Sequence, residues 1–593
     1  MNILSIQEGH TSTASLSIDD KIVACASEER FLRKKNWEGY PRNAINFLLK
    51  KYPVKIDKVI LAGLYAPALS LLGREHNFSM EHHIRQQREH FYPIFYKKKN
   101  PHKTQKKFFD KLIKEFKIKQ SDSQYLFKKK YIYTCNPWID LKTFKKIRTQ
   151  TLCEHLNISE SCIEVIDHHR GHIYYAYFAS PFRKKKCLIV TADGDGDYGI
   201  NITYSIANKD IIREIYRKPN QPVAKIWRYF TTMLGMKPQQ HEYKVMGLAP
   251  YANEHITSKV YNELNNHYGV KGINFYTKKK PKDLYFHFKE KFEGIRFDGL
   301  AGGLQLWTEE ITKKWFKNVI RKTGVNRVVF SGGLAMNIKV NKILSEMKEI
   351  KEFYVAATGG DESLPIGGCY YGISKKITPK PLNNIYLGPD FSTEEILKTL
   401  KSYKSKRKLR YKKINSKSVA KLLFEDKIIA RFSGRMEFGA RALGNRSILA
   451  NPSKFNLIKK INDQIKMRDF WMPFTPIVLR EKSSKYIINP KNIDCPHMTV
   501  AFDTTKLGQK HFKAAIHPYD YTMRPQLLRK GDNKNLHNLI KEFEKLSGIS
   551  GLLNTSFNLH GYPIVCNPID AIKTFLNSDL DYLYFNDEYL VYR

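Results

Sequence analysis

The sequence predicts an α/β protein of two domains, and three observations lead to that prediction. Short runs of β-branched and aliphatic residues alternate with amphipathic helical patterns. A strand followed by a glycine turn and a helix recurs along the chain. The chain has 593 residues, too many for one ordinary core, and the proline-containing stretch KKITPKPLNN interrupts the pattern near residue 380. We therefore expect one domain over 1–378 and a second over 379–593.

The N-terminal segment predicts three strands and a helix. NILSIQ, ASLSI and KIVACASEER have the composition of strands, and IDDK between the last two is a hairpin signal. Residues 42–51 have the period of an amphipathic helix. A strand group followed by a helix is a common opening of an α/β domain.

Four later segments resume the pattern after a basic interruption. CIEVIDHHRGHIYYAYFA predicts a strand leading into a helix, and CLIVTADGDGDYGINITYSI predicts two strands around an acidic glycine turn. RVVFSGGLAMNIKVNKIL and EFYVAATGGDESLPIGGCYYGI each predict a strand, a glycine loop and a helix. No repeat of fixed period is visible in the sequence.

Charge and composition restrict the function less than the motifs do. The formal charge of +44 predicts a positive field that attracts nucleotides, phosphosugars, nucleic acid or anionic membrane. Much of it lies between Arg74 and Arg148, where solvated helix faces are the simpler interpretation and a polyanion surface the alternative. The chain has no apolar run of about 18 residues and no leader pattern, and its eight scattered cysteines form no paired spacing. We expect a cytoplasmic protein with free thiols.

A metal site is predicted from histidines and aspartates that follow strands. His168 and His172 are four residues apart, so a helix places both imidazoles on one face. The turn TADGDGDYG offers Asp193, Asp195 and Asp197 as oxygen ligands, and Asp361 follows two glycines at another strand end. A surface helix with spare histidines is the competing interpretation of the histidine pair.

Glycine turns after strands predict a nucleotide cleft. SGGLAMN follows a β-branched run and precedes a helix, so its backbone N–H groups are able to approach a phosphate. The candidate nucleotide-binding residues are Gly332, Gly333, Asn337 and Gly360.

The second half contains cations and amides typical of an anion pocket. FSGRMEFGARALGNRS combines three arginines with glycines, and arginine presents planar donors to phosphate or carboxylate oxygens. The candidates for this pocket are Arg435, Arg441, Arg446, Lys466, Arg468, Arg524, Asn554, Ser556 and Asn558.

Taken together, these motifs resemble the NodU-type O-carbamoyltransferase family, which includes the tobramycin and nodulation-factor carbamoyltransferases. The matching stretches include GHTSTASLSIDDKIVACASEERF, DHHRGHIYYA, TADGDGDYG, HEYKVMGLAPYA, SGGLAMN, GRMEFGARALGNRSILANP, FWMPFTPIVL, TMRPQ and LLNTSFNLHGYPIV, over nearly the whole chain. Two positions depart from the family pattern: Thr11 replaces an acidic residue, and Pro365 is expected to shift the start of the following helix.

The resemblance implies a fold and a two-step reaction. It implies an N-terminal actin-like (ASKHA-type) ATPase domain of two subdomains and a C-terminal YrdC-like α/β domain. The C-terminal domain would form carbamoyladenylate from carbamoyl phosphate and ATP with Mg²⁺, and the N-terminal domain would transfer the carbamoyl group. Carried over by motif, His168, His172, Asp193 and Asp361 would hold a divalent metal ion, expected to be Fe²⁺. His10 would be the general base, with Arg441 and Lys466 as further catalytic residues.

Several alternatives stay open at this point. The acceptor hydroxyl belongs to a sugar, an antibiotic, a toxin, another small molecule or a glycan, with no obligate nucleic acid and no membrane span expected. Threonylcarbamoyl transfer to tRNA and a non-catalytic polyanion-binding role are the competing functions. A homodimer is possible.

Overall fold

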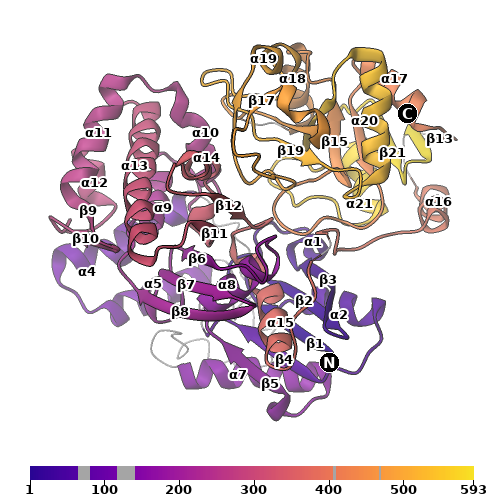
Figure 1. Ribbon diagram of the computed structural model, residues 1–593. Coiled ribbons are helices and arrows are strands. Elements are labelled where there is room, and N and C mark those ends of the chain that lie inside the picture. Colours follow the sequence, from indigo (N-terminus) through magenta and orange to yellow (C-terminus); the bar gives the residue numbers. More distant parts are fainter. Residues whose placement is uncertain (65–79, 116–140, 383, 405–408, 467–468) are drawn as a thin grey trace.

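The first of three main sheets contains the N-terminal strands. The computed structural model describes residues 1–64, 80–115, 141–382, 384–404, 409–466 and 469–593 (Figure 1). This sheet has the order β3-β2-β1-β4-β5, in which β1 to β3 form an antiparallel meander and β4 and β5 are parallel to β1. Its strands are β1 (Ile3–Gln7), β2 (Thr13–Ile18), β3 (Lys21–Ser27), β4 (Lys58–Ala62) and β5 (Ile163–Ile166). The predicted helix at 42–51 is confirmed as α2 (Arg42–Lys51), which follows the short α1 (Glu29–Leu32).

The second sheet repeats the plan of the first. Its order is β12-β11-β6-β7-β8, with an antiparallel meander from β6 to β8 and with β11 and β12 parallel to β6. Its strands are β6 (Cys187–Ala192), β7 (Ile202–Asn208), β8 (Ile211–Lys218), β11 (Arg327–Ser331) and β12 (Glu352–Val355). The sequence shows no fixed period because the connections between equivalent strands differ greatly in length.

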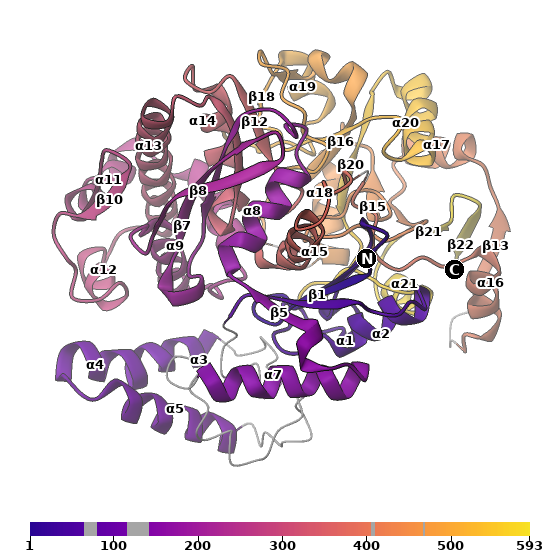
Figure 2. The same ribbon diagram turned by 60° about the horizontal axis from the view of Figure 1, so that its bottom comes forward.

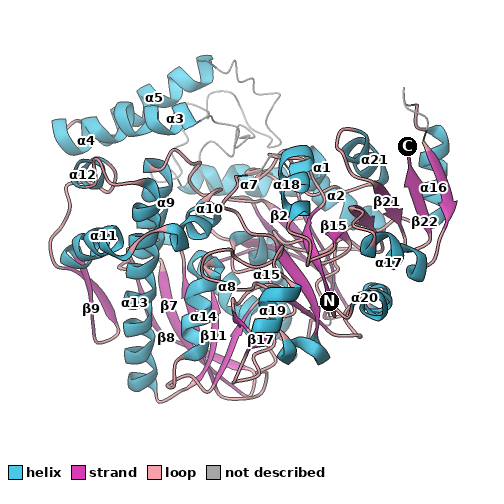
Figure 3. Ribbon diagram, turned by 90° about the horizontal axis from the view of Figure 1, so that it is seen from above, coloured by secondary structure: helices cyan, strands magenta, loops and turns pink. Residues whose placement is uncertain are grey.

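Helices α8 (His168–Phe178) and α15 (Leu364–Ser374) each follow the last strand of a sheet and lie between the two sheets (Figures 2 and 3). They cross with backbone against backbone: a Cβ atom on Gly367 would lie 1.9 Å from the carbonyl oxygen of Gly171. Pro365 lies in the first turn of α15, where a backbone N–H has no partner within the helix, and the helix forms without a kink.

The connection between β8 and β11 forms a helical layer beside the second sheet. The long helix α13 (Phe297–Thr323) buries Trp307 and Trp315 in the largest core. The other elements of this layer and of the connection to β12 are α9 (Val223–Met233), α10 (Glu242–Leu248), η6 (Ala249–Tyr251), α11 (Glu254–His267), β9 (Tyr268–Lys271), β10 (Asn274–Thr277), α12 (Phe286–Lys291), η7 (Gly333–Met336) and α14 (Ile338–Glu346).

The basic stretch is an insertion between β4 and β5. Its described elements are α3 (Met80–Arg85), η2 (Gln86–Phe91), α4 (Tyr92–Lys97), α5 (Pro101–Glu115) and α7 (Leu141–Leu156). Lys97, Lys103 and Lys106 are exposed, as the solvated-face interpretation predicts, whereas α7 packs Phe144 into the core of the first sheet. The lysine run that starts at Lys128 is outside the described residues.

The C-terminal part contains one mixed sheet of the order β13-β22-β21-β14-β15-β20-β16-β19. These strands are β13 (Arg410–Lys413), β14 (Ile429–Phe432), β15 (Arg446–Ala450), β16 (Thr475–Leu479), β19 (Gln526–Leu528), β20 (Gly551–Ser556), β21 (Tyr582–Phe585) and β22 (Tyr589–Tyr592). Its helices are α16 (Thr393–Ser402), α17 (Ser416–Phe424), α18 (Asn456–Ile461), η9 (Asn462–Lys466), α19 (Lys506–His511), α20 (Lys534–Ser547) and α21 (Pro568–Leu576).

The N-terminal and C-terminal parts are joined by hydrogen bonds from arginines. The Arg33 guanidinium donates to the carbonyl oxygens of Ile564 and Pro563, at 2.7 and 2.8 Å, and Arg30 donates to Gly439. In the described part of the chain, no helix is long and apolar enough to cross a bilayer. The seven cysteines within the described ranges are free thiols.

We predict that Gly367→Ala destabilises the protein by about 3 kcal/mol or more, because the new Cβ atom would overlap the backbone of Gly171. Differential scanning fluorimetry measures the effect. Gly531→Ala is the matched control, since a Cβ atom there meets nothing within 4 Å, and we expect a change within about 0.5 kcal/mol. Equal melting temperatures for the two variants would contradict the close helix crossing.

Candidate functional site

A cavity of about 730 Å³ lies between the N-terminal sheets and the C-terminal sheet. Both parts of the chain line it, so residues far apart in sequence share one space. The sequence-predicted residues on its wall are His10, Asp193, Gly333, Asn337, Gly360, Asp361, Arg441, Lys466, Arg524, Asn554, Ser556 and Asn558.

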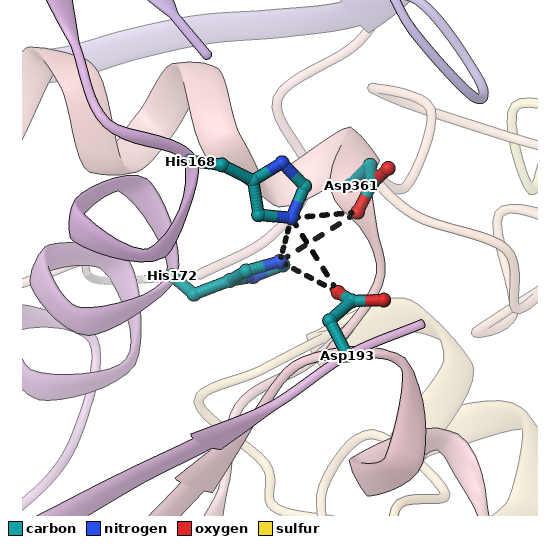
Figure 4. Close-up of side chains that lie close together, drawn as sticks. All are labelled: His168, His172, Asp193 and Asp361. Atoms are coloured by element: carbon teal, nitrogen blue, oxygen red, sulfur yellow. Dashed lines mark hydrogen bonds and ion pairs between the residues drawn. The ribbon is translucent and has the colours of Figure 1, made fainter. Parts of the chain in front are cut away.

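Four candidate metal ligands converge at one end of this space. His168 and His172 lie in the first turns of α8, whose N-terminus is capped by Asp167. Asp193 follows β6, and Asp361 follows β12 just before α15. Figure 4 shows the two imidazoles and the two carboxylates directed toward one point.

The spacing of these four side chains fits a single ion. The Nε2 atoms of His168 and His172 are 3.2 Å apart, and the Asp193 Oδ2 atom lies 3.0 Å from the second of them. The Asp361 Oδ1 atom lies 3.5 and 3.6 Å from the same two nitrogens. Metal bonds of about 2.0–2.1 Å give ligand separations of about 2.9–3.4 Å, which these contacts approach. The residues therefore fit a divalent first-row metal ion, whose identity the geometry does not select.

The electrostatics of the cluster also favour a positive charge. Burial disfavours a charged His168, but the carboxylates of Asp361 and Asp193 outweigh it and raise the pKa of His168 to about 10. Burial alone would raise the pKa of Asp193, and the hydrogen bonds from the two histidines hold it well below its usual range. Without a metal ion, the carboxylates thus retain a proton on the histidines, and a metal ion has to displace it.

The two other aspartates of the acidic turn have different partners. Asp195 pairs with Lys225 at 2.7 Å. Asp197 accepts hydrogen bonds from the backbone N–H groups of Leu64 and His168, at 2.9 and 2.7 Å. Asp197 therefore positions the start of α8, and neither residue joins the ligand cluster.

The glycine turn after β11 donates a hydrogen bond to Asp193, one of the candidate metal ligands. Gly332 has a φ of +93°, and a Cβ atom there would lie 2.3 Å from the carbonyl oxygen of Ala192, so this residue packs against the end of β6 and does not line the cavity. The Gly333 N–H donates to the Asp193 carboxylate at 3.1 Å. Asn337 lines the cavity but uses its side chain to cap α14. Nucleotide contact by this turn stays a prediction for Gly333, Asn337 and Gly360.

On the C-terminal wall, Lys466 joins the separated S-x-N element. Its Nζ atom donates to the Ser556 carbonyl at 2.7 Å and to the Ser556 hydroxyl at 3.1 Å. It also contacts the side-chain and backbone oxygens of Asn558. Asn554 is buried and donates to the Ala442 carbonyl at 2.9 Å. The structure thus brings together residues that are about ninety positions apart.

Arg441 presents its guanidinium group to the cavity. Burial lowers the pKa of Arg441, which is a sign that its charge is poorly solvated. Within the described residues, no carboxylate forms a salt bridge with it. A desolvated cation of this kind is stabilised when an anionic ligand binds beside it.

Two of the arginines predicted for the anion pocket, Arg435 and Arg446, do not line the cavity. Arg446 is fully buried and donates to the backbone carbonyls of Ser433 and Pro389, and its guanidinium lies 3.6 Å from the Phe432 ring centroid. Arg435 donates to the carbonyls of Val23 and Leu387 at 2.9 and 2.7 Å. Neither lines the cavity, because backbone oxygens hold both groups. The predicted Arg468 lies outside the described residues.

The sequence reasoning missed a second group of basic residues on the cavity wall. These residues are Lys35, Lys225, Arg228, Lys237, His241, Lys244 and also His560 from the C-terminal part. Burial and the charges of Lys244, Lys35 and Lys237 lower the pKa of His241 to about 3, so its imidazole is neutral. HEYKVMGLAPYA contains two of these residues, but its letters alone do not show which side chains face a cavity.

His10 lies in the loop after β1 and lines the same cavity. Its Nδ1 atom is 4.0 Å from the Glu38 carboxylate, and its side chain is 28% exposed. An imidazole that is partly open to the cavity is able to reach a ligand there.

The fold and the site define an α/β enzyme with a candidate metal centre facing a cationic cavity. Comparison with known families identifies the group it transfers. Residues 2–369 match the family model of the carbamoyltransferase N-terminus, and residues 420–593 match that of the carbamoyltransferase C-terminus. The chain belongs to this family and is a carbamoyltransferase, which excludes the non-catalytic alternative.

Similar proteins match either the whole chain or a part of it. The protein MJ1051 of Methanocaldococcus jannaschii is 31% identical over 98% of both chains. Nodulation protein NolO of Bradyrhizobium diazoefficiens is 27% identical over 70% of this chain and 77% of its own length. Component A of the (R)-2-hydroxyglutaryl-CoA dehydratase of Acidaminococcus fermentans covers 63% of this chain with a TM-score of 0.33 and 12% identity, a likeness too low to support an argument.

We predict that metal affinity at the four-ligand site rises with pH. His168 has its pKa raised to about 10, so a proton must leave it when a metal ion binds below that pH. The apparent affinity should increase by about tenfold per pH unit between pH 6 and 8 for one displaced proton, while Asp193 stays ionised throughout. Competition titrations with a chelator measure it. A pH-independent affinity over this range would contradict the assignment of His168 as a ligand.

We predict that Arg446→Ala lowers the free energy of unfolding by about 2–4 kcal/mol, since it removes buried hydrogen bonds from the guanidinium to the carbonyls of Ser433 and Pro389. Chemical denaturation followed by tryptophan fluorescence measures this loss. Arg410→Ala, at an exposed position of β13, should change stability by less than about 0.5 kcal/mol. A stable Arg446→Ala variant with a raised KM for carbamoyl phosphate would instead support the original binding assignment.

Proposed function

We propose that this carbamoyltransferase is an ATP-dependent O-carbamoyltransferase with two linked half-reactions. Carbamoyl phosphate and ATP form carbamoyladenylate beside the C-terminal cations, and the carbamoyl group then moves to an acceptor hydroxyl near the His/Asp cluster. The observation that carries the proposal is that Arg441, Lys466 and the metal-ligand carboxylates of Asp193 and Asp361 line one cavity. A shared cavity allows an activated intermediate to pass between sites without entering bulk water.

In the first half-reaction, water cleaves the P–O bond of carbamoyl phosphate and yields carbamate and phosphate. A carbamate oxygen then attacks the α-phosphorus of ATP, and pyrophosphate leaves. Carbamoyl phosphate, carbamate and ATP are all anions, so their approach requires cations that reduce the repulsion and fix the geometry. Arg441 supplies a desolvated guanidinium, and Lys466 supplies an ammonium group already oriented by Ser556 and Asn558.

In the second half-reaction, the acceptor oxygen attacks the carbamoyl carbon and AMP leaves. We assign His10 as the base that takes the hydroxyl proton, because its imidazole faces the cavity and is partly exposed. His168, His172, Asp193 and Asp361 would hold a divalent metal ion, with Fe²⁺ favoured by the family resemblance. Such an ion supplies Lewis-acid polarisation of the carbamoyl carbonyl.

The cavity volume and charge suit this set of ligands. About 730 Å³ lies in the range of small-molecule and cofactor sites and accommodates a nucleotide with a small donor. Lys35, Lys237 and Lys244 add further basic side chains to the lining of the cavity that Arg441 shares. The two five-stranded sheets have the same strand arrangement, and we assign them to an actin-like ATPase domain. We assign the eight-stranded mixed sheet to a YrdC-like domain, with the boundary between the two domains near residue 380.

The acceptor is proposed as a hydroxyl of a small molecule or glycan, with a cytoplasmic enzyme. Transfer to tRNA remains the competing acceptor class, and no described feature of the cavity favours it. Incubation with ATP, carbamoyl phosphate and a metabolite extract, followed by mass spectrometry, detects any product heavier by one carbamoyl group. A modified tRNA in the same assay would replace the small-molecule proposal.

We predict that Arg441→Ala abolishes carbamoyl-phosphate-dependent pyrophosphate release, with a loss of about a hundredfold or more, because it removes a cation beside the reacting anions. His10→Ala should retain pyrophosphate release and lose transfer by a similar factor. Radiolabelled ATP–pyrophosphate exchange and product mass spectrometry separate the two steps.

Arg321→Ala is the control for these variants, since Arg321 is exposed on α13 outside the cavity. It should leave both steps unchanged. If His10→Ala stops pyrophosphate release as well, the proposed division of the reaction between the two ends of the cavity is wrong.

A further inference from the structure

A second group of potential metal ligands lies in the layer beside the second sheet. Glu263 and His267 are four residues apart on α11, and His287 comes from α12. Figure 1 shows these helices with β9 and β10, away from the C-terminal part. None of the three side chains lines the cavity described above. The carbamoyl-transfer reaction therefore gives them no role.

The three ligand atoms face one another at the spacing of a metal site. The Nε2 atom of His267 is 3.2 Å from the Oε1 atom of Glu263 and 3.2 Å from the Nε2 atom of His287. All three atoms lie within 4.8 Å of one another. Zinc bonds of about 2.0–2.1 Å require neighbouring ligands about 3.3 Å apart in a tetrahedral arrangement. The two measured contacts are close to that value.

A hydrogen bond to a backbone carbonyl fixes the orientation of the His267 ring. Its Nδ1 atom lies 2.6 Å from the Lys279 carbonyl oxygen, which only accepts, so Nδ1 carries a proton. In the neutral ring, the Nε2 lone pair then faces the carboxylate oxygen and the second imidazole. This Nδ1–H···O=C contact is the arrangement that orients metal-bound histidines. A single proton on Nε2 would have to be shared between two partners, whereas a metal ion contacts all three.

The donor set selects the class of ion. Two imidazole nitrogens and one carboxylate suit borderline first-row metals such as zinc more than calcium or magnesium, which prefer oxygen. Only one side chain of the cluster is anionic, and several lysines lie nearby in sequence, in residues 278–282. Because the net charge of this region does not attract a cation, binding must come from coordination by the two imidazoles.

We infer that Glu263, His267 and His287 bind a zinc-class divalent metal ion as a second, structural centre of this protein. Three protein ligands leave at least one position for water. The ion joins the end of α11 to the start of α12 across the hairpin of β9 and β10.

This centre would also stabilise the surface on which the basic insertion rests. The loop before α12 carries Asp283, which accepts a hydrogen bond from Tyr96 of α4. Phe286 packs edge-to-face on Tyr92, with ring centroids 5.1 Å apart. A metal ion that fixes the start of α12 therefore fixes the contact surface of the helical insertion.

The test is metal stoichiometry in the full-length protein. The protein is stripped with a chelator, loaded with Zn²⁺, passed through gel filtration and measured by inductively coupled plasma mass spectrometry. We expect two equivalents in the wild type and one in His172→Ala, which removes the first centre. His172→Ala/His287→Gln should bind none, and Zn²⁺ should raise the melting temperature of His172→Ala but not of the double variant.

The matched control is His255→Ala, which removes another histidine from α11 outside the cluster and should retain two equivalents. Glu263→Gln keeps the shape of the ligand set and should weaken Zn²⁺ binding in the His172→Ala background by at least about tenfold. It replaces His287→Gln if that variant fails to fold. Equal zinc content and affinity with and without the His287→Gln or Glu263→Gln substitution would overturn the inference. The three side chains would then be joined by hydrogen bonds alone.

Discussion

The candidate metal site depends on the close crossing of α8 and α15. Gly171 and Gly367 meet backbone to backbone, with no room for a side chain between them. This crossing brings the helix that carries His168 and His172 against the segment that carries Asp361. The Asp361 Oδ1 atom therefore lies 3.5 Å from the Nε2 atom of His168 and 3.6 Å from that of His172. A larger residue would push the helices apart by more than these contacts tolerate. Close backbone packing beside the candidate ligands thus sets the spacing of the site.

The cavity shows how a highly basic chain uses some of its charge. The lysines in the described helices of the insertion face water, whereas Arg441, Lys237 and Lys244 lie where protein groups shield them from it. Lys244 pairs with Asp469 of the C-terminal part at 2.7 Å, so one of these cations also joins the two walls. Arg435 and Arg446 hold backbone carbonyls and keep the arginine-rich loop in place. The same residue type therefore lines the cavity at one position and holds backbone carbonyls a few residues away.

The sequence predicted the elements and the convergence of the four candidate ligands better than it predicted which arginines face the cavity. His168 and His172 were predictable because helical spacing places them together, and Asp193 and Asp361 because both follow strands at glycine turns. The orientation of Arg446 was not predictable, since it depends on carbonyls of Ser433 and Pro389 that only the fold brings near. The cluster of Glu263, His267 and His287 was missed because its third member lies twenty residues away on another helix.

The repeated strand plan explains why the site lies where it does. In each sheet, the turn after the first strand and the helix after the fifth strand point into the space between the sheets. His10 follows β1 and Asp193 follows β6, while His168 begins α8 and Asp361 precedes α15. Two copies of one arrangement therefore supply two imidazoles and two carboxylates to the space between the sheets. The lengths of the connections differ, and the helical insertion and the α11–α12 layer lie within two of the long connections, outside these four positions.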